Sequence, residues 1–428
     1  MNGYVLVAAR LATPTQLFGD GGFLVVESGS VADVGRGSPP RGRRPVVDLG
    51  DALIVPGFID LHVHGGGGYE VNCATRAQVE ESVARMAEFH ARHGTTALVA
   101  TTVSDSPQAL RTAVEGVAEV TRMPGTGVLG SNLEGPWISR SRAGAQFPGA
   151  IRAPDVDELN DLVARSQGTL RMVTVAPELD GALDLIEAAR AAGLVVAIGH
   201  TEADYETACL ALDAGARHAT HLFNAMAPIH HRRPGPVAAA LADSRVFLEI
   251  VADGVHIHPA LISLVAQIAP ERLILMTDSI GATGTTPGRH RLGPLEVVVT
   301  EERAVLAGHE ETVAGSVLTM DKAVALAVRV AGMPLLSALQ AASLHPATVL
   351  GEKAKGHLGP GADADLVVLD NDFGVLATVV SGRAVYDPKG LLPPAAPAPP
   401  ITRHRAARGV TAVLGLDVGG THSPPGQP

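Results

Sequence analysis

The stretch PGFIDLHVHGGGG, residues 56–68, decides the fold of this chain. Apolar residues alternate with Asp60, His62 and His64 before four glycines end the pattern, which indicates a buried strand that runs into a loop. Side chains two residues apart on a strand point to the same face, so His62 and His64 can reach one metal ion or a pair of ions. The alternative is that these are simply two polar positions near the solvent end of a strand. Other motifs in the chain are needed to distinguish the two interpretations.

The composition favours an α/β protein with an aliphatic core. Of 428 residues, 46% belong to the hydrophobic set but only 3% are aromatic, which suits a parallel sheet covered by helices. The net charge of −11 argues against a nucleic-acid surface. No apolar run is long enough to predict a membrane span, and the two cysteines, Cys73 and Cys209, are too few for a disulfide framework. We therefore expect a cytoplasmic protein without nucleic-acid or membrane partners.

The middle of the chain alternates apolar strands with alanine-rich helices. Eight strands are predicted, at residues 58–63, 97–102, 128–134, 172–176, 195–200, 218–221, 247–251 and 273–278. Helices are predicted between them, for example at residues 75–94, 107–121, 180–193 and 201–215. Eight successive βα units predict a TIM (β/α)8 barrel, and the short sixth strand depends on the motif that it carries.

Short β-rich pieces occur near both ends of the chain. They lie at residues 4–8, 22–27, 31–34, 45–49, 365–369 and 377–386. We expect residues 1–55 and 356–388 to pair into one small β-sandwich domain beside a barrel of residues 56–355. Residues 389–428 contain the proline-rich LLPPAAPAPP at residues 391–400 and are predicted to form a linker and a disordered tail.

Polar residues recur at the predicted strand ends, where a TIM barrel places its chemistry. They are His62 and His64 after strand one, Glu134 after strand three, His200 after strand five, His221 in strand six and Asp278 after strand eight. Each residue alone could be a buried structural histidine or a helix cap. Because all of them fall at predicted strand ends, together they predict a functional site. Imidazoles with a carboxylate suit a divalent ion such as zinc, which activates water, and Asp278 is the natural acid and base for a hydrolase.

At this point the chain resembles a known family. The motifs, in order, are FIDLHVHGGGG, LEGPW, IGHT, THLFNAM, HHRRPG, VADGVHIHP, LMTDS and AGSVLTMDKAV. They are similar to those of the amidohydrolase superfamily, specifically its N-acetylglucosamine-6-phosphate deacetylases, over residues 1–388. The resemblance implies a metal-dependent hydrolase that releases acetate from N-acetyl-D-glucosamine 6-phosphate in amino-sugar catabolism. It also implies a homodimer, in which a loop of one subunit helps to close the phosphate site of the other.

Residue roles carry over from the same resemblance. Glu134, His200 and His221 are implied to bind the main metal, Asp278 to be the catalytic acid and base, and His62 and His64 to permit a second ion. The ions expected are therefore one or two per subunit, with zinc as the metal. The residues implied to contact the sugar phosphate are Ala145, Asn224, Ala225, Arg232, Asp253, Gly254, Val255, His256, Val313, Ala314 and Gly315. Arg232 offers a forked donor to a phosphate, although a solvated loop charge is the alternative.

One position departs from the family pattern, and the tail has a separate resemblance of its own. After LEGPW the family has a histidine in a Gly-Ala-His or Gly-Thr-His triplet, whereas this chain has Gln146. A glutamine can donate one hydrogen bond to a carbonyl group but cannot carry a positive charge. Near the end, GLDVGGTH resembles the start of a sugar kinase, and a chance glycine-rich tail is the alternative.

Three other functions are weighed against the deacetylase. A hydantoinase or dihydroorotase type would need a carboxylated lysine on strand four, and residues 171–178 contain no lysine. An N-acetylgalactosamine-6-phosphate deacetylase differs in its substrate by one hydroxyl group and stays open. A metal-free scaffold would lack metal ligands, and none of the expected ligands is missing.

Overall fold

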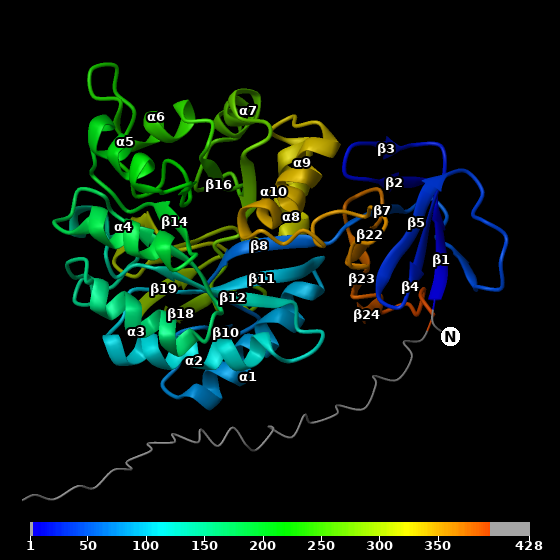
Figure 1. The fold of residues 1–428 in the computed structure, drawn as a ribbon, viewed down its shortest axis with the longest axis horizontal. Coiled ribbons are helices and arrows are strands. Elements are labelled where there is room, and N and C mark those ends of the chain that lie inside the picture. Colours follow the sequence, from blue (N-terminus) through cyan, green and yellow to red (C-terminus); the bar gives the residue numbers. More distant parts are fainter. Residues whose placement is uncertain (1–2, 394–428) are drawn as a thin grey trace, which may run out of the picture. The chain divides into compact units, whose positions relative to one another are not determined.

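Eight parallel strands form the central sheet of the computed structural model, which describes residues 3–393. They are β8 (Phe58–Val63), β11 (Thr95–Thr102), β12 (Val128–Glu134), β13 (Leu170–Val175), β14 (Val195–Ile198), β15 (His218–Ala219), β16 (Phe247–Val251) and β17 (Leu273–Met276). They follow one another in sequence order around the sheet. The last strand closes onto the first, since Ser279 bridges Val63 and the Asp278 amide donates to the His62 carbonyl at 3.0 Å. The predicted α/β barrel is therefore confirmed (Figure 1).

Helices cover the outside of this sheet. They are α1 (Arg76–Ala91), α2 (Pro107–Thr121), α3 (Val156–Ser166), α4 (Ala182–Ala191), α5 (Tyr205–Ala214), α6 (Gly235–Ala242), α7 (Pro259–Ile268), α8 (Met320–Arg329), α9 (Leu335–Ala342) and α10 (Leu344–Leu350), with a 3-10 turn at Arg140–Arg142. Thr75 begins α1 with a capping box, and Asp155 and Asp204 cap α3 and α5 through their side chains. Each of these residues satisfies amide groups at the helix start that would otherwise lack a partner.

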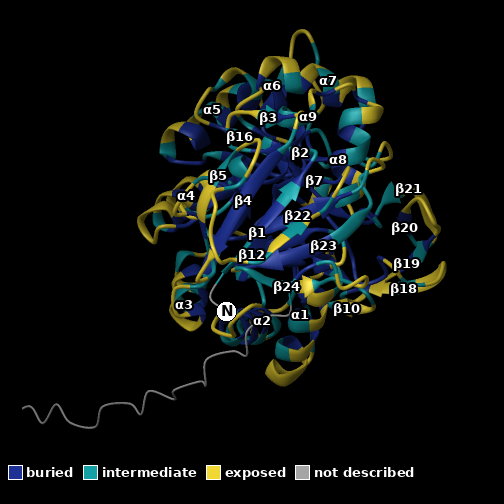
Figure 2. Ribbon diagram, turned by 90° about the vertical axis from the view of Figure 1, so that its right-hand side faces the viewer, coloured by how far each residue is buried: buried dark blue, intermediate teal, exposed yellow. Residues whose placement is uncertain are grey.

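Two further sheets are built from both ends of the chain. One has the order β5-β4-β1-β6 and the other β24-β23-β22-β7-β2-β3. Their bounds are β1 (Gly3–Ala8), β2 (Arg10–Ala12), β3 (Leu17–Phe18), β4 (Gly22–Glu27), β5 (Ser30–Arg36), β6 (Val46–Asp48), β7 (Leu53–Pro56), β22 (Leu366–Leu369), β23 (Val375–Val380) and β24 (Arg383–Tyr386). Because β22 pairs antiparallel with β7, the expected association of the two ends is observed. Figure 2 looks onto these strands, most of which are buried.

The chain passes from the end sheet into the barrel at Gly57. This residue separates β7 from β8, and its amide donates to the Asp365 carbonyl at 2.9 Å. A Cβ atom at this position would lie 2.0 Å from Oγ1 of Thr96, a distance that no side chain can adopt. A glycine is therefore required where the two sheets meet.

A four-stranded antiparallel sheet after β17 was not predicted. It contains β18 (Gly288–Leu292), β19 (Leu295–Val299), β20 (Ala304–Leu306) and β21 (His309–Val313). The short hairpin of β9 (Gly65–Gly66) and β10 (Tyr69–Glu70) was also missed. Both are short or largely exposed, so they lack the apolar alternation that reveals a buried strand.

The predictions for the tail and for membrane spans have different outcomes. The predicted tail of residues 394–428, with its kinase-like GLDVGGTH, lies outside the described residues. Within residues 3–393, no helix combines the length and the apolar character needed to cross a membrane.

Candidate metal centre

One group of possible ligands is formed by Glu134, His200 and His221. Oε1 of Glu134 lies 3.1 Å from Nε2 of His200 and 2.8 Å from Nε2 of His221. The two Nε2 atoms are 3.1 Å apart, so three potential ligand atoms converge on one point. Glu134 ends β12, whereas the two histidines lie two residues beyond the ends of β14 and β15.

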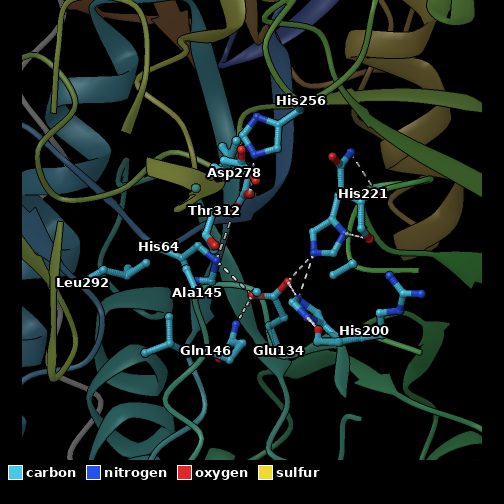
Figure 3. Close-up of a pocket in the computed structure, with 18 of the residues that line it drawn as sticks. His64, Glu134, Ala145, Gln146, His200, His221, His256, Asp278, Leu292 and Thr312 are labelled. Carbon is cyan, nitrogen blue, oxygen red and sulfur yellow. Dashed lines mark hydrogen bonds and ion pairs between the residues drawn. The ribbon is translucent and has the colours of Figure 1, made fainter. Parts of the chain in front are cut away.

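A second group is formed by His62, His64 and Asp278. Nε2 of His62 and Nε2 of His64 are 3.2 Å apart, and Oδ1 of Asp278 lies 3.2 Å from Nε2 of His64. Glu134 connects the two groups, because its Oε2 lies 3.1 Å from Nε2 of His64 while its Oε1 faces the first group. Figure 3 shows His64, Glu134, His200, His221 and Asp278 directed towards one another.

Three of these residues adopt a left-handed backbone. The φ angles are 47° at His200, 27° at His221 and 52° at Asp278, where side chains other than glycine are uncommon. The turn that each residue makes directly after its strand directs its side chain across the end of the barrel. Such strain persists only where the surrounding structure enforces it, and it is concentrated at functional sites.

The protonation of the imidazoles fits a bound cation. Nδ1 of His200, His221 and His64 faces the carbonyl oxygens of Arg142, Asn224 and Thr101, at 2.7, 3.2 and 3.1 Å. A carbonyl oxygen only accepts, so Nδ1 carries the proton and a neutral ring presents a bare lone pair at Nε2. Lone pairs and carboxylate oxygens about 3 Å apart repel one another unless positive charge lies between them. A divalent cation with nitrogen and oxygen ligands relieves that repulsion.

The charges of the centre are strongly coupled. Burial disfavours a protonated His64, but the hydrogen bonds that its ring donates to Asp278 and Glu134 outweigh this effect and raise the pKa of His64 to about 9. Burial likewise disfavours an ionised Glu134, yet the charges of His62 and His200 hold the pKa of this carboxyl well below its usual range. Glu134 is therefore held ionised by the histidines around it.

The two groups line a cleft of about 400 Å³. Its wall includes His256, whose Nδ1 lies 2.7 Å from Oδ2 of Asp253 and whose Nε2 lies 3.7 Å from Oδ2 of Asp278. Although burial opposes it, the hydrogen bond and charge of Asp253 raise the pKa of His256. His256 is therefore a hydrogen-bond donor directed at the cleft.

Comparison with known proteins places this geometry in a family. Residues 53–385 match the amidohydrolase family. The chain belongs to the amidohydrolase family. Amidohydrolases depend on metal ions, in agreement with the two ligand groups described above.

Relatives narrow the comparison within the amidohydrolases. Human N-acetylglucosamine-6-phosphate deacetylase is 42% identical over 349 residues, which cover 79% of this chain and 85% of the human protein. N-acetylgalactosamine-6-phosphate deacetylase of Escherichia coli O157:H7 is 38% identical, with 77% and 87% covered. The crystal structure of N-acetyl-D-glucosamine-6-phosphate deacetylase from Mycobacterium smegmatis is similar with a TM-score of 0.84 and 43% identity, covering 90% of this chain and 100% of that one.

Most of the site residues predicted for this amidohydrolase come together. The cleft is lined by His64, Glu134, Ala145, His200, His221, Asn224, Ala225, His256, Asp278, Val313 and Gly315. His62 lies fully buried behind His64. Ala314, Gly254 and Val255 do not line the cleft, and Asp253 acts on it through His256. Arg232 is exposed and also lies outside the lining, so its phosphate contact stays a prediction.

Gln146 occupies the position where the family pattern has histidine. Its Nε2 donates to Oε2 of Glu134 at 2.5 Å, and its Oε1 accepts from the Ser104 amide at 2.6 Å. Only 3% of the residue is exposed. Gln146 therefore holds the carboxylate that faces both ligand groups, in addition to lining the cleft.

Several residues at this centre were not predicted. Arg142 and Glu311 line the cleft, and Glu249 lies behind His62. Arg142 is in the loop between LEGPW and Gln146, where a cation beside a site motif was the available signal. Glu249 could have been found as the charged residue within the apolar strand FLEIV. Glu311 lies on β21, which had no apolar pattern to reveal it.

Proposed function

We propose that this chain hydrolyses N-acetyl-D-glucosamine 6-phosphate to D-glucosamine 6-phosphate and acetate. The observation that carries the proposal is the convergence of two ligand groups at one cleft. Glu134, His200, His221, His64 and Asp278 line the cleft, and His62 completes the second group from behind His64. Relatives named for this activity at 42% and 43% identity support the substrate. A second structure of the Mycobacterium smegmatis protein contains N-acetyl-D-glucosamine-6-phosphate, which supports the same assignment.

We propose that Glu134, His200 and His221 hold one ion, with His62, His64 and Asp278 available for a second. Zinc suits nitrogen and oxygen ligands of this kind. When bound, the ion polarises the acetyl carbonyl and lowers the pKa of water near it. A cytoplasmic location is proposed because the two cysteines are free, which fits a reducing compartment.

The remaining steps belong to the side chains. Asp278 accepts the proton of the attacking water on its carboxylate and returns it to the sugar nitrogen when the amide bond breaks. His256, held by Asp253, donates a hydrogen bond to a substrate oxygen. The walls of the cleft orient the acetyl group against Asp278.

For the phosphate group, we propose a charged contact at the mouth of the cleft. Among residues 3–393, Arg142 is the one Arg or Lys that lines the cleft, with its Nε 2.5 Å from Oε1 of Glu202. Arg232 lies on an exposed loop, where it is available to the cleft of a second copy in the proposed homodimer.

Replacing Arg232 by Ala should reduce the preference for phosphorylated over free sugar by about 10- to 100-fold, as expected for a charge-assisted pair. If the preference is unchanged, Arg232 does not bind the phosphate group. Arg142→Ala, measured in parallel, tests the other candidate.

The experiment that tests the function is acetate release from both 6-phosphorylated N-acetylhexosamines, with metal analysis of the same sample. We expect the glucosamine derivative to be preferred. The galactosamine derivative is the second candidate, because the Escherichia coli O157:H7 relative of that name is 38% identical. Release of acetate from neither sugar by fully metallated protein would reject the proposal.

A further inference from the structure

A buried carboxylate lies directly behind the ligand groups. Glu249 is on β16, between His62 of β8 and His218 of β15. The three residues are at most 1% exposed, and neither Glu249 nor His218 lines the cleft. Glu249 therefore does not contact substrate and has no role in the proton transfers proposed above.

The group that contacts Nδ1 of His62 differs from the groups that contact Nδ1 of the other three histidines. His64, His200 and His221 each turn Nδ1 to a backbone carbonyl oxygen. Nδ1 of His62 instead lies 3.4 Å from Oε2 of Glu249. A carboxylate partner makes an imidazole a stronger ligand than a neutral carbonyl does, because it stabilises the positive charge that the ring takes up.

A second histidine lies against the other oxygen of this carboxylate. Oε1 of Glu249 lies 2.8 Å from Nε2 of His218, although the two atoms are not aligned as a hydrogen bond. A buried charge of this kind is costly unless it has partners, and its partners here are two histidines.

We propose that Glu249 is a positioning residue that holds His62 with its proton on Nδ1, so that Nε2 is free to bind an ion in the group His62, His64 and Asp278. His218 holds Glu249 from the other side. The affinity of this second ion then depends on Glu249, whereas the ion at Glu134, His200 and His221 does not. The inference rests on the metal chemistry of the proposed function but not on its substrate.

The first test measures ion binding rather than hydrolysis. Metal-free protein is titrated with Zn²⁺ by calorimetry, and the bound metal is counted by elemental analysis. Glu249→Gln should weaken the second ion by about 10- to 100-fold and leave the first within about twofold, as found for partners of metal-binding histidines. Asp365→Asn is the matched control, because it removes a buried carboxylate from an ion pair in the small β domain. Equal affinities in wild type and Glu249→Gln would overturn the proposal.

A second test shows whether Glu249 acts through His62. In a His62→Ala background, Glu249→Gln should have no further effect on Zn²⁺ affinity, whereas additive effects would contradict the inference. If Glu249→Gln fails to fold, nitrogen NMR of the wild-type zinc protein with labelled histidine still decides. A proton on Nδ1 of His62 is expected, and a proton on Nε2 would overturn the proposal. Because neither readout uses acetate, both remain valid if the protein hydrolyses a different amide.

Discussion

At the scale of single residues, Asp278 lies between the ligand groups and the substrate cleft. Its Oδ1 faces His64 and its Oδ2 faces His256, so one carboxylate can exchange protons with groups on both sides. Burial opposes its charge, but the hydrogen bond from His64 lowers the pKa of Asp278 and keeps it a base. The proposed mechanism requires this carboxylate for proton transfer but not for substrate binding.

Asp278→Asn should therefore separate catalysis from binding. It keeps the shape of the side chain but cannot accept the proton, so we expect kcat to fall about 100-fold or more with KM much less affected. The measurement is kcat and metal content on the same sample. Near-normal turnover by fully metallated protein would exclude proton transfer. Loss of the ion at Glu134, His200 and His221 in proportion to activity would attribute the effect to metal binding instead.

Gln146 gives a second prediction at this scale. Its side chain joins Glu134 to the Ser104 amide, so Gln146→Leu removes both bonds and leaves a buried amide without its partner. We expect metal to be lost to a chelator about 10- to 100-fold faster, since Glu134 is no longer held. Gln340→Leu, which breaks a bond to the Pro14 carbonyl far from the cleft, is the control. Equal loss rates for wild type and Gln146→Leu would show that Glu134 needs no support.

At the scale of elements, α1 supports the loop after β8 through His90. Its Nε2 donates to the Gly65 carbonyl at 2.9 Å, and the ring is fully buried. Burial lowers the pKa of His90 to about 4, and the bond to Gly65 offsets this only in part. The unfolded chain, with a histidine pKa of about 6.5, therefore binds more protons than the folded chain between these two values.

Stability should accordingly fall as the pH drops from about 6.5 to about 4, by at most about 3 kcal/mol from this residue. His90→Gln keeps a donor for Gly65 but does not titrate, so its Tm should decrease less over the same range. The measurement is Tm at pH 7, 5.5 and 4 for wild type, His90→Gln and the exposed control His309→Gln. Parallel Tm curves for wild type and His90→Gln would contradict the prediction.

The elements also show what the sequence could predict. β8, β12 and β16 have the predicted bounds, because each has enough apolar residues to be recognised despite the polar positions within it. The strands before His200 and His221 end earlier than expected, since the left-handed turns depend on contacts made across the barrel. The sheet β18–β21 was missed because its outer strands β18 and β21 are largely exposed and its inner strands β19 and β20 are short. Glu311 in the cleft wall was therefore missed with it.

The same limit applies to the candidate site. The candidate ligands His62, His64, Glu134, His200 and Asp278 follow from strand ends, which sequence patterns locate. The bond from Gln146 to Glu134 and the contact of Glu249 with His62 join residues far apart in the sequence. Such contacts depend on side-chain direction inside the barrel, which periodicity does not determine.

At the scale of the whole molecule, the paired strands β7 and β22 contribute side chains to two hydrophobic cores. Val367 on β22 belongs to the large core of the barrel, whereas its neighbour Val368 belongs to the core between the two end sheets. β7 alternates in the same way, with Val55 in the first core and Ile54 in the second. Because the two strands pair with each other, loss of either core exposes an apolar face of both.

We therefore expect the barrel and the end sheets to unfold together, although their boundaries were predicted as those of separate domains. Trp137 is the single tryptophan of the chain and lies in the barrel core, so its fluorescence reports on barrel unfolding alone. Val367→Ala and Val368→Ala each remove two buried methyl groups, worth about 2 kcal/mol. If the units are coupled, both substitutions lower the transition seen by Trp137 by similar amounts, even though Val368 faces the other core. If Val368→Ala leaves that transition unchanged while circular dichroism shows an earlier one, the end sheets unfold independently of the barrel.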